Sequence, residues 1–289
     1  MKKIFMAVIA LMMTISASAQ FYIYYSDGTV AKVDSISLVG PDEDEDPNPS
    51  QGIGVFSVAK DKQVTFSPGN LQYHPVKDKW EFAPSQLDYI GGANSNVSNT
   101  LNAWIDLFGW STRATYFGVS ASDENSYYSG SFVDWGTNQI GNDAPNTWRT
   151  LTHDEWEYLL NTRTNASSLK GVAQVDGVNG LILLPDNWDC PSGVTFKSGF
   201  SNDSGTFGQY QTFTTDQWLL MENTGAVFLP AAGAREGVEV FDVRNYGSYW
   251  SATKDDYRDA YFFCFESRYA EMDFWERCVG SSVRLVKDL

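Results

Sequence analysis

The stretch THDEWEYLLN (152–161) carries the clearest fold signal in this chain of 289 residues. A threonine followed three residues later by a glutamate forms a capping box: the Thr152 hydroxyl accepts from the backbone N–H of Glu155, and the Glu155 side chain reaches back to Thr152. Trp156 and Leu160 then recur at the spacing of one helical face. This stretch predicts a helix that begins at Thr152.

A second stretch, TTDQWLLMENTG (214–225), has the same design. Thr214 and Gln217 repeat the capping box, Met221 lies on the inward face, and Gly225 suits the C-terminal cap. Short apolar runs bounded by Gly, Asn and Ser predict strands around these two helices. The runs are Val55–Val58, Gln63–Phe66, Trp80–Phe82, Leu181–Leu184, Ala226–Leu229, Ala260–Phe265 and Ser282–Val286. The sequence thus predicts one main domain over residues 53–289, with few helices among many short strands.

The N-terminus has the pattern of a secretory signal peptide over residues 1–19. Lys2 and Lys3 precede an apolar run, and Ala17-Ser18-Ala19 is a small-residue cleavage site. The run has about a dozen residues, whereas a bilayer span takes about 20. We therefore expect export to the periplasm, the outer surface or the medium. No later run is long enough to predict a membrane span.

Two short segments separate the signal peptide from the main domain. Residues 20–40 alternate in a strand-like pattern around Asp27-Gly28, a turn signal, and predict a small β-hairpin. Residues 41–52 contain five consecutive carboxylates, Asp42 to Asp46, flanked by prolines. Like charges repel and proline blocks regular pairing, so this segment is predicted to be an extended acidic, Pro-rich linker.

The overall composition excludes several functions. The formal charge is −16, from 36 Asp and Glu against 20 Lys and Arg, which disfavours nucleic acid and anionic lipid as partners. Two His and three Cys cannot build a multi-His or multi-Cys metal centre. Cys264 and Cys278 could pair across neighbouring strands, but three small buried thiols are the preferred interpretation. His74 and His153 are expected to be ordinary surface residues.

The segment from 250 to 278 is the candidate binding surface, because it concentrates aromatic and arginine side chains among polar neighbours. One face of the strand at 260–265 must still pack in the core. The candidate contact residues are Trp250, Asp255, Asp256, Tyr257, Arg258, Asp259, Arg268, Tyr269, Asp273, Trp275 and Arg277. Three of them, Asp255, Asp256 and Asp259, could alternatively supply oxygen ligands for calcium, although a solvated acidic loop explains them equally well.

Several strings in the chain together resemble a family of exported proteins of Bacteroidetes and Fibrobacter, the Fibrobacter succinogenes major paralogous domain. They are FSPGNLQY (66–73), WIDLFGWST (104–112), LTHDEWEYLLNTR (151–163), LILLPDNWDCPSG (181–193), GAVFLPAAGAREG (225–237), GSYWSAT (247–253) and SVRLV (282–286). That family is similar to the C-type-lectin-like fold of formylglycine-generating enzymes. The resemblance implies an α+β domain with two helices and a twisted, loop-rich antiparallel sheet. It also implies close termini and ligand contacts from the C-terminal loops.

The resemblance does not extend to the catalytic residues of those enzymes. The close Cys pair that binds copper is absent, and two histidines cannot form a three-His iron site. We therefore expect a non-catalytic binding or adhesion module without a cofactor, which recognises glycan or protein through its C-terminal loops. The alternatives are a fimbria- or envelope-associated structural subunit, a target of a diversity-generating retroelement, and a degenerate formylglycine-generating-type enzyme.

Overall fold

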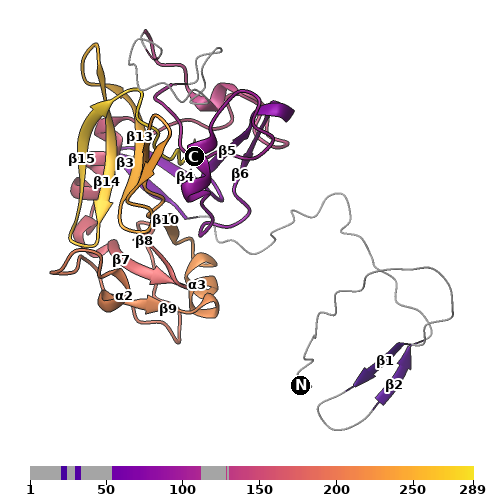
Figure 1. The fold of residues 1–289 in the computed structure, drawn as a ribbon. Helices are drawn as coiled ribbons and strands as arrows, with labels where there is room; N and C mark the ends of the chain where they lie inside the picture. The colour runs from indigo at the N-terminus through magenta and orange to yellow at the C-terminus, as the bar shows by residue number, and fades with distance from the viewer. Residues whose placement is uncertain (1–20, 25–29, 34–53, 112–127, 129) are drawn as a thin grey trace, which may run out of the picture. The chain divides into compact units, whose positions relative to one another are not determined.

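The computed structural model describes residues 21–24, 30–33, 54–111, 128 and 130–289. The chain divides into two compact units, Met1–Pro49 and Ser50–Leu289 (Figure 1). In the first unit, strands β1 (Phe21–Tyr24) and β2 (Val30–Val33) pair antiparallel, with Phe21 opposite Val33. The predicted signal peptide (1–19), the Asp27-Gly28 turn and the whole of the predicted linker (41–52) lie outside the described residues.

The larger unit begins and ends in one small sheet. Strand β4 (Lys62–Phe66) lies between β3 (Phe56–Ala59) and the last strand, β16 (Val286–Asp288), and both pairings are antiparallel. Val286 stands opposite Phe66, so the two ends of this unit meet (Figure 1).

A second sheet has the strand order β10-β8-β7-β9. Its strands are β7 (Lys170–Val175), β8 (Val178–Leu183), β9 (Thr212–Phe213) and β10 (Val227–Pro230). The short helix α2 (Phe207–Tyr210) and helix α3 (Thr215–Glu222) accompany it. Trp218 and Met221 of α3 are buried in a core formed with this sheet, as their spacing of three residues on one helical face predicts.

The third sheet consists of β13 (Gly247–Lys254), β14 (Asp259–Glu266) and β15 (Tyr269–Glu276) in consecutive antiparallel order. Its two faces enter different cores because side chains alternate along a strand. Phe263 lies on one face and stacks on Trp156 of helix α1 (His153–Glu157) with ring centroids 4.9 Å apart. Phe262 lies on the other face and packs against Trp250.

Smaller elements complete the larger unit. They are β5 (Leu71–His74), β6 (Lys79–Phe82), β11 (Ala234–Glu236), β12 (Glu239–Phe241), the π-helical turn η5 (Tyr158–Thr162) and the 3-10 turns η1 (Pro75–Lys77), η2 (Gly91–Asn96), η4 (Trp135–Thr137) and η6 (Ala166–Ser168). The described chain thus has few helices and several antiparallel sheets, consistent with the predicted α+β class.

Both predicted capping boxes are present, at Thr152 with Glu155 and at Thr214 with Gln217. Gly225 adopts a positive φ of 88° just after α3, as its place at the cap predicts. No described helix has the length and apolar character that a membrane crossing requires.

Three expectations from the sequence are wrong. Most of the predicted strand Ser282–Val286 is not a strand: only Val286 belongs to β16, while Ser282 and Arg284 run through the buried interior. His74 is not a surface residue, because it is 3% exposed and its ring packs edge-on against Trp104. Cys190 is exposed rather than buried, and none of the three cysteines, all of which are described, forms a disulfide.

Candidate functional site

The candidate segment 250–278 folds into the β13–β14–β15 sheet and its two connections. Residues 255–258 join β13 to β14, and the two-residue turn Ser267-Arg268 joins β14 to β15. Strand β15 bonds to β14 on one side and forms the outer edge of this sheet in the described chain (Figure 1). The predicted contact residues are therefore gathered in one sheet, but they differ in exposure.

Two of them, Trp250 and Arg277, are buried rather than exposed, contrary to what a contact surface requires. Trp250 is 1% exposed, and its Nε1 donates to the carbonyl of Phe108 at 2.6 Å. Arg277 is 2% exposed. The residue type alone does not predict whether an aromatic or arginine side chain is buried, because protein cores and binding surfaces both use these large side chains.

Arg277 instead fastens the loop before β14 to the core. Its guanidinium lies 4.7 Å from the ring centroid of Trp110. Its Nε donates to the carbonyl of Asp259 at 3.3 Å, and its Nη2 donates to the carbonyl of Asp256. Burial lowers the pKa of Arg277, and the neighbouring Asp256 opposes that effect. The buried guanidinium of Arg277 therefore holds the loop through two backbone carbonyls.

Residues 255–258 form the exposed tip above Arg277. The Asp256 carboxylate accepts from the backbone N–H groups of Arg258 at 2.6 Å and Asp259 at 2.8 Å, which lowers its pKa. Tyr257 is 80% exposed, and Arg258 forms an ion pair with Glu276 of β15. The tip is thus an ordered turn that presents one aromatic ring to solvent.

The three aspartates suggested as calcium ligands do not converge as a metal site. Asp256 already uses its carboxylate to hold the turn. The pKa of Asp259 is raised by partial burial and then by the negative charge of Asp256. Among the described residues no group of three or more His, Cys, Asp or Glu side chains could hold a metal ion. Calcium binding stays a prediction from the sequence alone.

Strand β15 has two different faces. On the first face, which we call the acidic face, Glu271 and Asp273 are exposed between the half-buried rings of Tyr269 and Trp275. The Trp275 ring packs against Phe262 at 5.6 Å between centroids, which fixes its orientation. Burial and nearby Glu266 raise the pKa of Tyr269 to about 12, so its hydroxyl stays protonated at neutral pH.

The second face, which we call the apolar face, carries Met272 and Phe274. Phe274 is 54% exposed. Its ring stands edge-on to the ring of Tyr261, with 6.4 Å between the two ring centroids. Tyr261 in turn packs against His153 at 4.3 Å between ring centroids. These three rings form an aromatic row beside the exposed tip.

Sequence reasoning missed part of this surface. Glu271 and Phe274 were not among the predicted contacts, and β15 was not predicted as a strand. The signal was present, since Tyr269, Glu271, Asp273 and Trp275 alternate with period two. No local signal could place His153 beside Tyr261, because the two residues come from a helix and a strand far apart in sequence.

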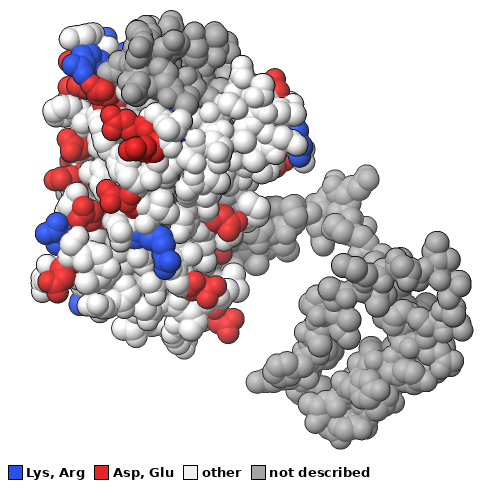
Figure 2. All heavy atoms as spheres, in the orientation of Figure 1, with Lys and Arg blue, Asp and Glu red and all other residues white. Residues whose placement is uncertain are grey.

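Negative charge follows the same edge. Figure 2 shows carboxylate side chains gathered along the side of the larger unit where β14 and β15 lie. Arg268 is exposed at the turn and pairs with Glu266 at 3.4 Å. Arg258 likewise pairs with Glu276. Glu271 and Asp273, by contrast, form no ion pair with another described residue, so their part of the edge favours a partner of positive charge.

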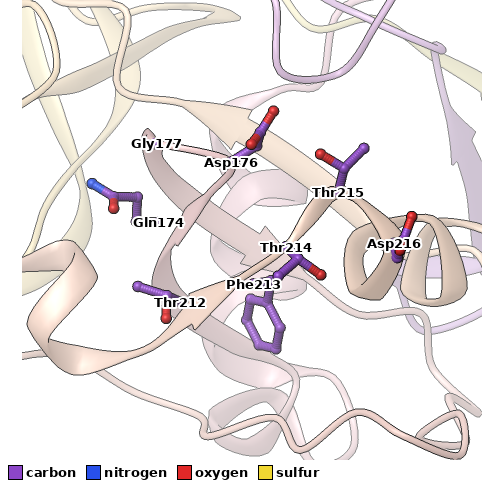
Figure 3. A pocket seen from close by; sticks show the side chains of 8 residues that line it. All are labelled: Gln174, Asp176, Gly177, Thr212, Phe213, Thr214, Thr215 and Asp216. Atoms are coloured by element: carbon purple, nitrogen blue, oxygen red, sulfur yellow. The ribbon is translucent and has the colours of Figure 1, made fainter.

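A separate hollow of about 430 Å³ lies between the end of β7, β9 and the start of α3 (Figure 3). Its lining consists of Gln174, Asp176, Gly177, Thr212, Phe213, Thr214, Thr215 and Asp216. It is wide and polar, and it includes none of the predicted contact residues. The hydroxyl of Thr214 is already used in the cap of α3. This hollow therefore has no feature that assigns it a ligand.

Comparison of the chain with protein-family models, with curated proteins and with solved structures finds no match.

Proposed function

We propose that this protein is an exported, non-catalytic recognition module of C-type-lectin-like fold, which binds a glycan or a protein through the β13–β15 sheet and its tip. The observation that carries the proposal is the contrast within one sheet. Tyr257 and Phe274 are strongly exposed, whereas Trp250 and Arg277 below them are buried. Exposed rings on a rigid support are typical of recognition surfaces, because little side-chain entropy is lost on binding.

The fold assignment has two sources of support. The two capped helices lie where the family resemblance expects them. Strands β4 and β16 join the two ends of the larger unit, as the close termini of a C-type-lectin-like domain require. Export rests on the signal-peptide pattern of residues 1–19.

The non-catalytic assignment is supported by how the histidines are used. The ring of His74 is buried, and its Nδ1 accepts from the backbone N–H of Lys77 at 3.4 Å. His153 lies between Tyr261 and the exposed Asp154, whose carboxylate is 2.9 Å from its Nδ1. Neither histidine stands beside a Ser or Cys nucleophile in the contacts of the described chain.

The test is a binding screen of the mature protein on a broad glycan array, in parallel with co-purification from the envelope of the source cells. The variant Tyr257→Ala/Phe274→Ala should lose about tenfold or more in affinity for whatever is bound, since exposed aromatic anchors contribute most to such contacts. The matched control is Leu219→Ala/Leu220→Ala, which removes two exposed apolar side chains from α3 and should bind normally.

Equal binding by both variants and the wild type would contradict the proposal, because the ligand would then use another surface. A glycan signal would favour a lectin-like role, and an envelope partner would favour a structural subunit. Stoichiometric copper or iron in the purified protein would instead support an enzyme.

A further inference from the structure

The register of the β14–β15 pair decides which backbone groups of β15 face outward. Just beyond the strands, the N–H of Arg277 donates to the carbonyl of Arg258 at 3.2 Å. Asp259 and Glu276 form the next opposed pair, and the register then continues without a shift. Hydrogen-bonded and non-hydrogen-bonded pairs alternate in an antiparallel ladder. Ala270, Met272 and Phe274 therefore direct their N–H and C=O groups away from β14.

An independent contact agrees with this register. Tyr261 is opposed to Phe274, and its carbonyl accepts from the Ser251 hydroxyl of β13 at 2.8 Å. The carbonyl of Tyr261 thus faces β13, as it must if this pair is not hydrogen-bonded.

The outward groups of Ala270, Met272 and Phe274 have no backbone partner among the described residues. The N–H of Phe274 is held by the carboxylate of its neighbour Asp273 at 2.9 Å. A strand of eight residues with free ladder positions is a template for pairing with another extended chain.

The side chains of β15 specify what that chain should carry. An added strand continues both faces of the sheet, so its side chains meet those of β15 on the same face. Opposite Glu271 and Asp273 on the acidic face, Lys or Arg would be favourable. Opposite Met272 and Phe274 on the apolar face, aliphatic or aromatic residues would be favourable.

We propose that β15 is the docking edge for an extended segment of a partner protein in which basic and apolar residues alternate, and that this segment adds antiparallel as a fourth strand. The inference rests on the proposed recognition function and names its partner class. A second copy of β15 is disfavoured, because antiparallel pairing would place carboxylates against carboxylates.

The probe is a capped synthetic peptide in which Lys and Val alternate, measured by fluorescence anisotropy with the mature protein. Two N-methylated forms test for strand addition. In an antiparallel pair, the residues opposite Ala270, Met272 and Phe274 share the apolar face, so the valines direct their N–H groups to β15. N-methylation of the valines should abolish binding, whereas N-methylation of the lysines should preserve it.

Two further measurements locate the peptide. Amide hydrogen exchange at Met272 and Phe274 should slow in the complex, while exchange at Glu271 and Asp273, already bonded to β14, should not change. The variant Glu271→Lys/Asp273→Lys should bind about tenfold more weakly. The matched control, Asp189→Lys/Asp216→Lys, makes the same change of charge at exposed positions elsewhere and should bind as the wild type apart from a small uniform effect.

Equal loss with both N-methylated peptides, or binding without slower exchange at Met272 and Phe274, would overturn the inference. Absence of peptide binding would overturn it as well. If a glycan still bound through Tyr257 and Phe274 in that case, the proposed recognition function would stand and only the docking edge would fail.

Discussion

Replacing Arg277 by methionine should weaken the fold by removing the buried cation beneath the exposed tip. Methionine keeps much of the side-chain volume against Trp110 but cannot donate hydrogen bonds. The substitution therefore separates the polar role of Arg277 from its packing role.

The contacts of Arg277 set the magnitude. Its guanidinium donates to the carbonyls of Asp259 and Asp256 and lies 4.7 Å from the ring centroid of Trp110. Each hydrogen bond from a charged donor contributes about 1.5–3 kcal/mol, and a desolvated cation over a ring contributes about 2 kcal/mol. The desolvation penalty of the guanidinium opposes these gains, and water can reach the exposed loop at Asp256. We expect the free energy of unfolding to fall by about 2–3 kcal/mol.

Urea unfolding of the protein without residues 1–19, followed by circular dichroism, measures this change. The matched control is Arg268→Met, because Arg268 is exposed at the turn and its loss should change stability by less than about 0.5 kcal/mol. A double-mutant cycle with Trp110→Leu should give a coupling of about 2 kcal/mol for the cation–ring contact. The reasoning would be refuted if Arg277→Met and Arg268→Met were equally stable.

Three further predictions concern residues that support the fold. Burial raises the pKa of Asp106 from 3.8 to about 6, so its ionised form is disfavoured in the folded state. The free energy of unfolding should therefore fall by about 3 kcal/mol as the pH rises from about 4 to above 6. Asp106→Asn should remove this pH dependence in urea titrations at several pH values, and an unchanged pH dependence would contradict the assignment. Thr152→Ala should cost about 1 kcal/mol by removing the cap of α1, and Thr152→Ser should restore it in the same assay. A Cβ at Gly136 would lie 1.7 Å from the carbonyl oxygen of Trp148. Gly136→Ala should therefore lower the free energy of unfolding by about 2 kcal/mol or more, which a thermal melt would show as a lower melting temperature. A variant as stable as the wild type would show that the backbone of this turn can shift at little cost.

The sequence alone predicted the features that depend on neighbours within a few residues. A capping box joins positions three apart, so the residues at Thr152 and Thr214 predicted the starts of the two helices independently of the rest of the chain. Most of the predicted strands are also present, with shifted ends, because short apolar runs between turn residues must be buried somewhere.

The candidate surface was predicted only in part. Residues 255–258 lie together at one exposed tip, with Asp259 half-buried beside them. The sequence did not reveal that Trp250 and Arg277 are buried, since the same residue types serve both core and surface.

The tertiary structure alone decided which of these side chains reach solvent. Arg277 is buried because Trp110 and the loop before β14 close around it, and β15 is an edge because no further described strand pairs with it. Both facts depend on which distant segments of the chain pack, or do not pack, against these residues. The periodicity of the sequence predicts that side chains alternate between the two faces of a strand, but it does not predict what packs against each face.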